Sequence, residues 1–181
     1  MASERQLDPN ALGDHIDRLY RAAWALCGSR EDAEDLVQET FARVLRKPRL
    51  LRSEDDIGYL LRVLRNTFFS SRRTAARRPQ TTALPDDADL IEDSSGFASP
   101  EKFVETDELY SAISSLPDDF RDALVAIDVV GMSYREAARA LRVREATITT
   151  RLHRARQRVA HSLSQLQPDP STKQAPATRK R

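Results

Sequence analysis

The chain has 181 residues, and its 29 basic side chains almost balance its 28 acidic ones, so the formal net charge is only +1. Glycine is scarce and aromatic residues make up 6% of the chain, a composition that favours packed helices over sheet. No stretch reaches the roughly 20 apolar residues of a membrane span, and the amino terminus has no apolar signal segment. We therefore expect an all-α protein that remains in the cytoplasm.

Two helices are predicted in the first 46 residues. Apolar residues recur at three- and four-residue steps from about residue 10 to 26, which indicates one buried stripe, and Gly28 suits the position that ends this helix. Ser29 can cap the second helix, which we expect to stop near Arg46, before Pro48. The predicted stripes are Leu12, Ile16, Leu19, Tyr20, Ala23 and Leu26, then Ala33, Val37, Phe41, Val44 and Leu45. The outer face of the second helix carries Asp35, Gln38, Glu39 and Arg43. From periodicity alone we interpret this face as a solvated surface, and the alternative is a docking surface.

A third helix is predicted from about Asp55 to Arg78, and its outer face mixes cations, an amide and aromatic rings. Arginines neutralise phosphates, aromatic rings stack on unpaired bases and amides read base edges, so this mixture favours single-stranded or melting DNA. The alternative is a basic solvated helix with Phe69 tucked into the core. The residues of this face are Tyr59, Arg62, Arg65, Asn66, Phe69, Arg72 and Arg73. Together, the three helices form a first predicted domain, residues 10–78.

Residues 79–104 are predicted to be a flexible acidic linker. The segment Gln80–Pro100 is rich in Pro, Ser, Thr and Asp and cannot bury enough apolar area to offset its ordering entropy. At the other end, residues 166–181 are proline-rich and finish in three basic residues, which predicts a disordered basic tail.

A second domain, residues 105–165, is predicted to contain a helix-turn-helix. Ser133 and Glu136 form a capping box ahead of a helix at Tyr134–Leu141, and a three-residue turn then leads to a helix from Glu145 to about Leu163. Two further helices, near Phe103–Leu116 and Asp118–Val130, precede this pair. Short hydroxyl side chains at the amino end of the last helix, followed by arginines, are typical of a helix that enters the major groove of DNA.

An enzyme is disfavoured. His15 lies in the first predicted helix and His153 and His161 in the last, the phosphate-binding pattern G-x-x-x-x-G-K is absent, and Cys27 is the only cysteine. We expect no catalytic site, no metal site and no cofactor, and we expect Cys27 to be a buried, inert thiol.

Three segments carry a specific resemblance to a known family. DAEDLVQETFARVL (Asp32–Leu45), YLLRVLRNTFFSSRR (Tyr59–Arg73) and Leu116–Val159, which holds the predicted helix-turn-helix, resemble bacterial RNA polymerase sigma factors of the extracytoplasmic-function (ECF) group. The resemblance implies two small helical domains that bind core RNA polymerase and promoter DNA, and it makes an anti-sigma factor an expected further partner. The runner-up function is a stand-alone helix-turn-helix regulator that binds an operator.

The resemblance also implies roles for individual residues. It assigns core polymerase binding, at the β′ clamp helices and with the β subunit as a further partner, to Asp35, Gln38, Glu39 and Arg43. It assigns −10 DNA contacts to Tyr59, Arg62, Arg65, Asn66, Thr67, Phe69, Arg72 and Arg73, with residues 65–67 at a loop that captures a flipped base. It assigns −35 DNA contacts to Glu145, Ala146, Thr147, Thr149, Thr150, Arg151 and Arg154. In this family the turn of the helix-turn-helix often has glycine where Arg142 stands.

Overall fold

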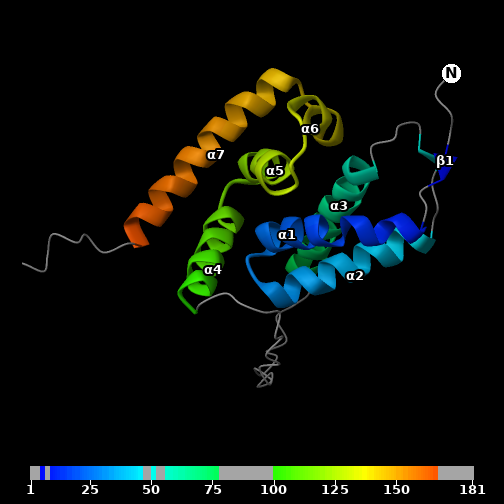
Figure 1. Cartoon of the computed structure of the whole chain (residues 1–181), viewed down its shortest axis with the longest axis horizontal. Helices are drawn as coiled ribbons and strands as arrows, with labels where there is room; N and C mark the ends of the chain where they lie inside the picture. The colour runs from blue at the N-terminus through cyan, green and yellow to red at the C-terminus, as the bar shows by residue number, and fades with distance from the viewer. Residues whose placement is uncertain (1–4, 7–8, 47–49, 52–55, 78–99, 167–181) are drawn as a thin grey trace, which may run out of the picture.

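The computed structural model describes residues 5–6, 9–46, 50–51, 56–77 and 100–166, and in these ranges the chain is almost entirely helical (Figure 1). A short 3₁₀ helix, η1, precedes the first α-helix, and a short π-helical segment, η2, continues the fifth. The elements are η1 (Pro9–His15), α1 (Ile16–Cys27), α2 (Arg30–Arg46), α3 (Asp56–Arg77), α4 (Pro100–Ser114), α5 (Asp118–Leu124), η2 (Val125–Val129), α6 (Tyr134–Leu141) and α7 (Glu145–Leu166). Two-residue strands, β1 (Arg5–Gln6) and β2 (Leu50–Leu51), pair antiparallel. The all-α prediction is confirmed.

The two least regular predicted segments fall largely outside the described residues. Of the predicted linker, only residues 100–104 are described, and they form the first turn of α4. Of the predicted tail, only residue 166 is described, as the last residue of α7.

In the first half, α1 ends and α2 begins at the residues that the sequence predicted. Gly28 has φ +84°, and its N–H donates to the backbone oxygen of Trp24 at 2.7 Å, so it terminates α1 in the left-handed conformation that favours glycine. The hydroxyl of Ser29 accepts from the N–H of Asp32 at 3.2 Å at the start of α2. Glu31 and Asp32 occupy the first turn of α2, where the helix dipole favours negative charge.

The helix-turn-helix of the second half is present as predicted. Ser133 and Glu136 form a reciprocal capping box, in which the Glu136 carboxylate accepts from the N–H of Ser133 at 2.8 Å. These hydrogen bonds lower the pKa of Glu136. Arg142 ends α6 with φ +58° and is the one non-glycine residue with positive φ among the described residues. A turn of three residues then leads into α7.

The start of the first predicted helix and two positions of the apolar stripes differ from prediction. Residues 9–15 form a 3₁₀ helix rather than the first turns of α1. Ile16 is 46% exposed at the junction, where the change from three residues per turn to 3.6 displaces the stripe. Leu45 is 51% exposed because the buried stripe of α2 passes through Thr40 and Val44, and Leu45 lies about 100° beyond Val44.

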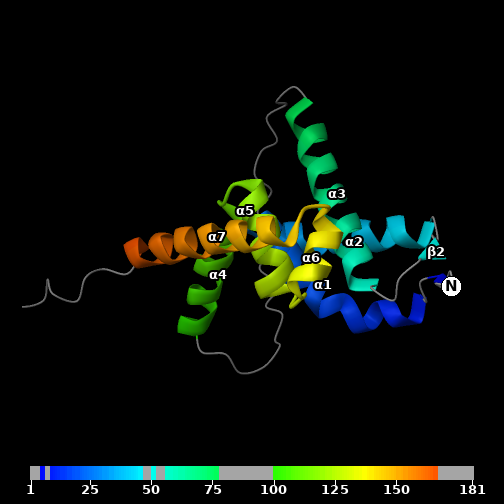
Figure 2. The ribbon, with the colours of Figure 1, turned by 90° about the horizontal axis from the view of Figure 1, so that it is seen from above.

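The hydrophobic core is continuous through both halves of the chain. Helix α1 packs on α2 and α3 of the first half and also on α4 and η2 of the second, and α3 packs on α6. Figures 1 and 2 show the first three helices beside the last four, with the end of α3 projecting from the body. The fully buried side chains include Leu19, Leu60 and Leu64 from the first half and Val125, Ile148 and Leu152 from the second.

Candidate nucleic-acid interface

The four residues predicted on the outer face of α2 lie together on an exposed ridge. Asp35, Gln38, Glu39 and Arg43 are all exposed. The guanidinium of Arg43 pairs with the Glu39 carboxylate at 2.6 Å across one helical turn. Since both side chains are in solvent, this pair contributes only about 0.3–0.5 kcal/mol to stability. The ridge therefore keeps its carboxylates accessible to another molecule.

The residues predicted on α3 divide into exposed, half-buried and buried groups. Asn66, Arg72 and Arg73 are exposed, whereas Tyr59, Arg62, Arg65 and Phe69 are half-buried. Thr67 is 1% exposed, and its hydroxyl donates to the backbone oxygen of Val63 at 2.9 Å, so its side chain faces the core and not the outer face. Residues 65–67 lie in the middle of a continuous helix rather than at a loop.

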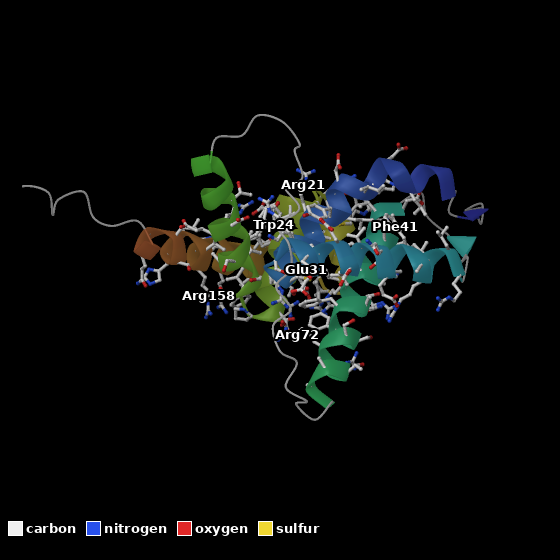
Figure 3. All side chains as sticks on the ribbon, turned by 90° about the horizontal axis from the view of Figure 1, so that it is seen from below. Arg21, Trp24, Glu31, Phe41, Arg72 and Arg158 are labelled. Carbon is white, nitrogen blue, oxygen red and sulfur yellow. The ribbon has the colours of Figure 1, made fainter. Side chains whose placement is uncertain are left out.

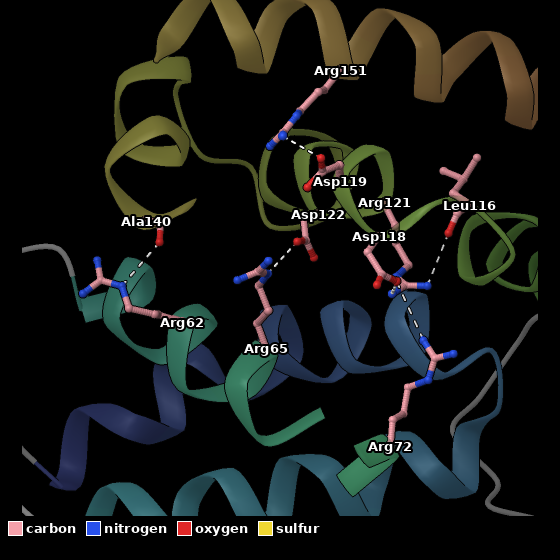
Figure 4. Close-up of polar contacts among 10 residues, drawn as sticks. All are labelled: Arg62, Arg65, Arg72, Leu116, Asp118, Asp119, Arg121, Asp122, Ala140 and Arg151. Atoms are coloured by element: carbon pink, nitrogen blue, oxygen red, sulfur yellow. Dashed lines mark hydrogen bonds and ion pairs between the residues drawn. The ribbon is translucent and has the colours of Figure 1, made fainter. Parts of the chain in front are cut away.

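The arginines of α3 make contacts with the second half that the sequence did not indicate (Figure 4). The side chain of Arg62 donates to the backbone oxygen of Ala140 in α6 at 3.3 Å. The side chain of Arg65 pairs with the carboxylate of Asp122 in α5 at 2.5 Å. Arg72 lies 3.7 Å from the carboxylate of Asp118 at the start of α5. This face of α3 is thus held against α5 and α6.

Two buried charged residues lie at the centre of these contacts. The side chain of Asp122 is 4% exposed, and burial raises the pKa of its carboxyl group more than the adjacent Arg65 lowers it. Its second oxygen, Oδ1, is buried without a hydrogen-bond partner in the described part of the chain. The side chain of Arg121 is 3% exposed, donates to the backbone oxygen of Ser114 at 2.9 Å and lies 5.2 Å from the centre of the Phe68 ring.

A second group of contacts between the halves surrounds the only tryptophan. The ring of Trp24 stacks on that of Tyr110 in α4, with centroids 4.1 Å apart and planes at 11°. The guanidinium of Arg30 lies over the Trp24 ring at 4.5 Å and also pairs with Asp107 of α4 at 3.2 Å. Farther along α1, the side chain of Arg18 donates to the backbone oxygen of Val130 at 2.8 Å. Figure 3 shows Trp24 at the junction of the two halves.

The predicted DNA-reading face of α7 is mostly open. Ile148, Leu152, Ala155 and Val159 are buried, as their spacing predicted. On the other side, Glu145, Ala146, Thr149, Thr150 and Arg154 are exposed, and Thr147 is half-buried. Arg151 differs from these residues because its side chain pairs with Asp119 at 2.6 Å, within the second half.

A cleft of about 820 Å³ lies where α2, α3 and the junction of α4 and α5 meet. Its lining includes Asp35 and Glu39 from the ridge of α2, Arg72 from α3, and Leu116 from the second half. Cys27 lines the same cleft and is half-buried rather than buried. Burial raises the pKa of its thiol from 9.0 to about 12, which favours the less reactive protonated form.

No group of three or more His, Cys, Asp or Glu side chains within the described ranges is placed to hold a metal ion. None of the helices described is both long enough and apolar enough to cross a membrane.

The fold and its exposed faces define a two-part helical protein with a helix-turn-helix in its second part. The family model of Sigma-70 region 2 matches residues 12–78, and that of Sigma-70, region 4 matches residues 106–159. The chain is 38% identical over 156 residues to the ECF RNA polymerase sigma factor SigE of Mycolicibacterium smegmatis, a match that covers 83% of this chain and 59% of that one. It is 31% identical over 146 residues to the ECF RNA polymerase sigma factor EcfG of Rhodopseudomonas palustris, covering 80% of this chain and 78% of that one.

Two solved structures share the fold. The sigma factor RpoE of Bartonella quintana, in complex with the anti-sigma factor NepR, has a TM-score of 0.64 and 25% identity, covering 87% of this chain and 98% of that chain. CnrH, in complex with the cytosolic domain of CnrY, has a TM-score of 0.62 and 21% identity, covering 86% of each chain. The chain belongs to the ECF group of RNA polymerase sigma factors, although it spans only about three fifths of the length of the SigE relative.

Proposed function

We propose that this chain directs core RNA polymerase to promoters: α2 binds the polymerase, α3 helps to open the −10 element and α7 reads the −35 element. The observation that carries this proposal is that one chain presents both a polar, arginine-rich helix and a helix-turn-helix, each within its own Sigma-70 region. In this account the chain catalyses no reaction itself, and it acts on the chromosome in the cytoplasm. Residues 10–78 and 105–165 are the two working domains.

The amino end of α7 supports duplex recognition. Ala146, Thr149 and Thr150 are exposed and short, so the helix can approach base edges closely in the major groove. Arg154 is exposed one turn farther along, where a cation contacts the phosphate backbone and fixes the register.

The outer face of α3 supports contact with unpaired DNA. Arg72 and Arg73 are exposed cations for the backbone, Asn66 is an exposed amide for a base edge, and the half-buried ring of Phe69 provides a stacking surface. Taking a base out of the duplex costs a few kcal/mol, which stacking and hydrogen bonding to that base offset.

The ridge of α2 supports binding to a basic surface of the polymerase. Asp35 and Glu39 are exposed carboxylates on one helical face, and Gln38 lies between them as a hydrogen-bonding group. Such charge complementarity speeds association and fixes the docking register. The complexes of RpoE with NepR and of CnrH with CnrY further support an anti-sigma factor as the partner that restrains this chain.

The direct test compares binding to core polymerase and to duplex DNA. The wild-type chain is expected to bind core polymerase and to protect promoter DNA from DNase I only when core is present. The variant Glu39→Arg, which reverses a charge on the ridge, is expected to weaken core binding at least about tenfold. Asp17→Arg is the matched control, because Asp17 is an exposed acid of α1 that is outside the ridge. Protection of duplex DNA by the chain alone would instead favour a stand-alone regulator.

A further inference from the structure

The turn between α6 and α7 holds an arginine in a conformation that suits glycine. Arg142 has φ +58° and ψ +44°, and its N–H donates to the backbone oxygen of Ala138. The N–H of Val143 donates to the same oxygen at 3.0 Å, so two hydrogen bonds hold the chain in this left-handed turn. A residue with a Cβ is disfavoured here, whereas glycine adopts the conformation freely. The backbone therefore gives no reason for an arginine at this position.

No contact within the described part of the chain offsets the strain at Arg142. Its side chain is exposed, and no carboxylate among the described residues pairs with its guanidinium group. Strained backbone positions cluster at sites that hold ligands, where the side chain has a use outside the fold. The side chain of Arg142 is thus directed to solvent and available to another molecule.

Arg142 is one of four exposed arginines in and before this turn. Arg135 and Arg139 lie one turn apart on the exposed face of α6, and Arg144 follows Arg142 by two residues. Within the described ranges, none of the four forms an ion pair. The carboxylate of Glu136 on the same helix accepts hydrogen bonds from the capping box instead. The group is therefore a local concentration of positive charge that suits a polyanion.

The turn borders the face of α7 that is proposed to read the −35 element. The backbone oxygen of Arg144 accepts from the N–H groups of Thr147 and Ile148 at 2.9 and 3.2 Å, so Arg144 stands at the amino end of α7. Figure 1 shows this turn at the edge of the molecule. When the second helix of a helix-turn-helix enters the major groove by its amino end, the first helix crosses the phosphate backbone. The turn between the helices then lies at the rim of the groove, beside phosphates.

We propose that Arg142 and Arg144 bind phosphates of duplex DNA at the edge of the −35 element, and that this contact explains an arginine at a strained position. The proposal rests on the proposed function of α7 and adds contacts outside its reading face. Arginine suits the role because its planar guanidinium donates two hydrogen bonds to one phosphate. Such contacts do not read bases, but they fix the register in which α7 meets them.

The first test measures how duplex binding depends on salt, and it needs neither core polymerase nor a known promoter. The full chain is titrated into a fluorescein-labelled duplex of random sequence, and binding is followed by anisotropy. Binding of this kind is weak, with a dissociation constant on the order of 10⁻⁴–10⁻⁶ M, and is distinct from a footprint on a promoter. Each phosphate contact contributes about 0.9 to the slope of log affinity against log salt.

Arg142→Gly is expected to lower this slope by about 0.9, the value for one contact. If the two affinities meet at about 1 M salt, the variant binds about fifteenfold more weakly than wild type at about 50 mM salt and about fourfold more weakly at about 200 mM. Glycine relieves the positive φ, so the weaker binding does not come from unfolding, and circular dichroism checks this. Adding Arg144→Gln should lower the slope by roughly the same amount again.

Three further variants separate the charge of Arg142 from its backbone conformation. Arg142→Asn removes the cation but keeps a residue that tolerates positive φ, so it should match Arg142→Gly. Arg142→Lys keeps the charge and should keep the wild-type slope. Arg156→Gln is the matched control, because it also removes one cation from the second half, but one that is already paired with Asp128 at 2.6 Å. Its slope should equal that of wild type.

The second test locates the contact on promoter DNA in the complex with core polymerase. Phosphates of a duplex that carries the −35 element are replaced one at a time by uncharged methylphosphonates. The complex with wild-type chain should lose affinity at a phosphate beside the element. The complex with Arg142→Gly should be insensitive to replacement of that same phosphate, because the two changes remove one interaction.

An unchanged salt slope in Arg142→Gly, or an equal fall in Arg156→Gln, would overturn the proposal. An unchanged slope combined with weaker binding to core polymerase would assign these arginines to a protein partner and would overturn it as well. If the wild type directs core polymerase to no start site, the proposed function is wrong, and the salt slopes still decide whether Arg142 binds phosphate. If the wild type initiates normally and Arg142→Gly keeps its slope, the function stands and the phosphate contact is refuted.

Discussion

The thiol of Cys27 provides a chemical measure of how tightly the two halves are packed. Cys27 ends α1 in the first half, and the cleft that it lines is closed on the other side by Ser114, Ser115 and Leu116 of the second half. Burial is the main reason that its pKa rises from 9.0 to about 12. The reaction of this single cysteine with DTNB, the aromatic disulfide 5,5′-dithiobis(2-nitrobenzoic acid), is therefore expected to be slow in the folded chain.

The size of the effect follows from two opposing factors. At pH 8 a pKa of about 12 leaves the thiolate on the order of a thousandfold scarcer than in the unfolded chain, where the pKa is near 9.0. A more basic thiolate is also intrinsically more nucleophilic, by roughly twentyfold over this range. The net expectation is a reaction about fiftyfold slower in the folded chain than in the chain unfolded by guanidinium, before any steric protection is counted.

The pH dependence separates this explanation from simple steric blocking. The rate for the unfolded chain should level off above pH 9, whereas the rate for the folded chain should keep rising about tenfold per pH unit through pH 10. Asp122→Asn, which removes the carboxylate that pairs with Arg65 between the two halves, should speed the folded reaction. A folded rate within a few-fold of the unfolded rate at pH 8, or a plateau near pH 9 in both states, would refute the reasoning.

Three further predictions concern stability and are checked by thermal and urea unfolding. Ser133→Ala should lower the free energy of unfolding by about 1 kcal/mol. Hydrogen bonds with Ser133 lower the pKa of Glu136 from 4.5 in the folded chain. The part of the stability difference that comes from this carboxylate should therefore be complete above pH 4.5 and shrink as the pH falls through the pKa of the folded state. Arg142→Gly should raise stability by about 0.5–1 kcal/mol, since glycine relieves the positive φ, and equal or lower stability would contradict this. Leu64→Ala should cost about 2–5 kcal/mol, whereas Leu45→Ala, at a half-exposed position, should cost less than about 0.5.

Local structure was largely predictable from the sequence because its signals are local. Glycine at residue 28, the Ser133 capping box and the apolar steps of α7 each act over a few residues, and the structure confirms all three. The errors were also local in cause. Ile16 lies where a 3₁₀ turn changes the helical period, and the side chain of Thr67 turns to the core because α3 continues without a break.

The contact between the halves could not be predicted by the same means. Helical periodicity identifies which face of α3 is apolar but not which molecule covers the polar face. Arg65 and Asp122 are 57 residues apart, and neither has an unusual sequence neighbourhood. The one available signal was the group of acids in α5. Asp118 and Asp119 lie in its first turn, where they suit the positive end of the helix dipole, and Asp122 lies one turn farther on. The helix dipole explains the first two of these acids, and no local pattern in the sequence identifies the third as a partner for α3.

The central claim is that this chain gives core RNA polymerase its promoter specificity, and run-off transcription tests it most directly. Purified core polymerase, the chain and a library of promoter fragments are combined, and the start sites are mapped. The account predicts defined start sites that share both a −10 and a −35 element and that require the chain. A pattern of start sites identical with and without the chain would contradict it.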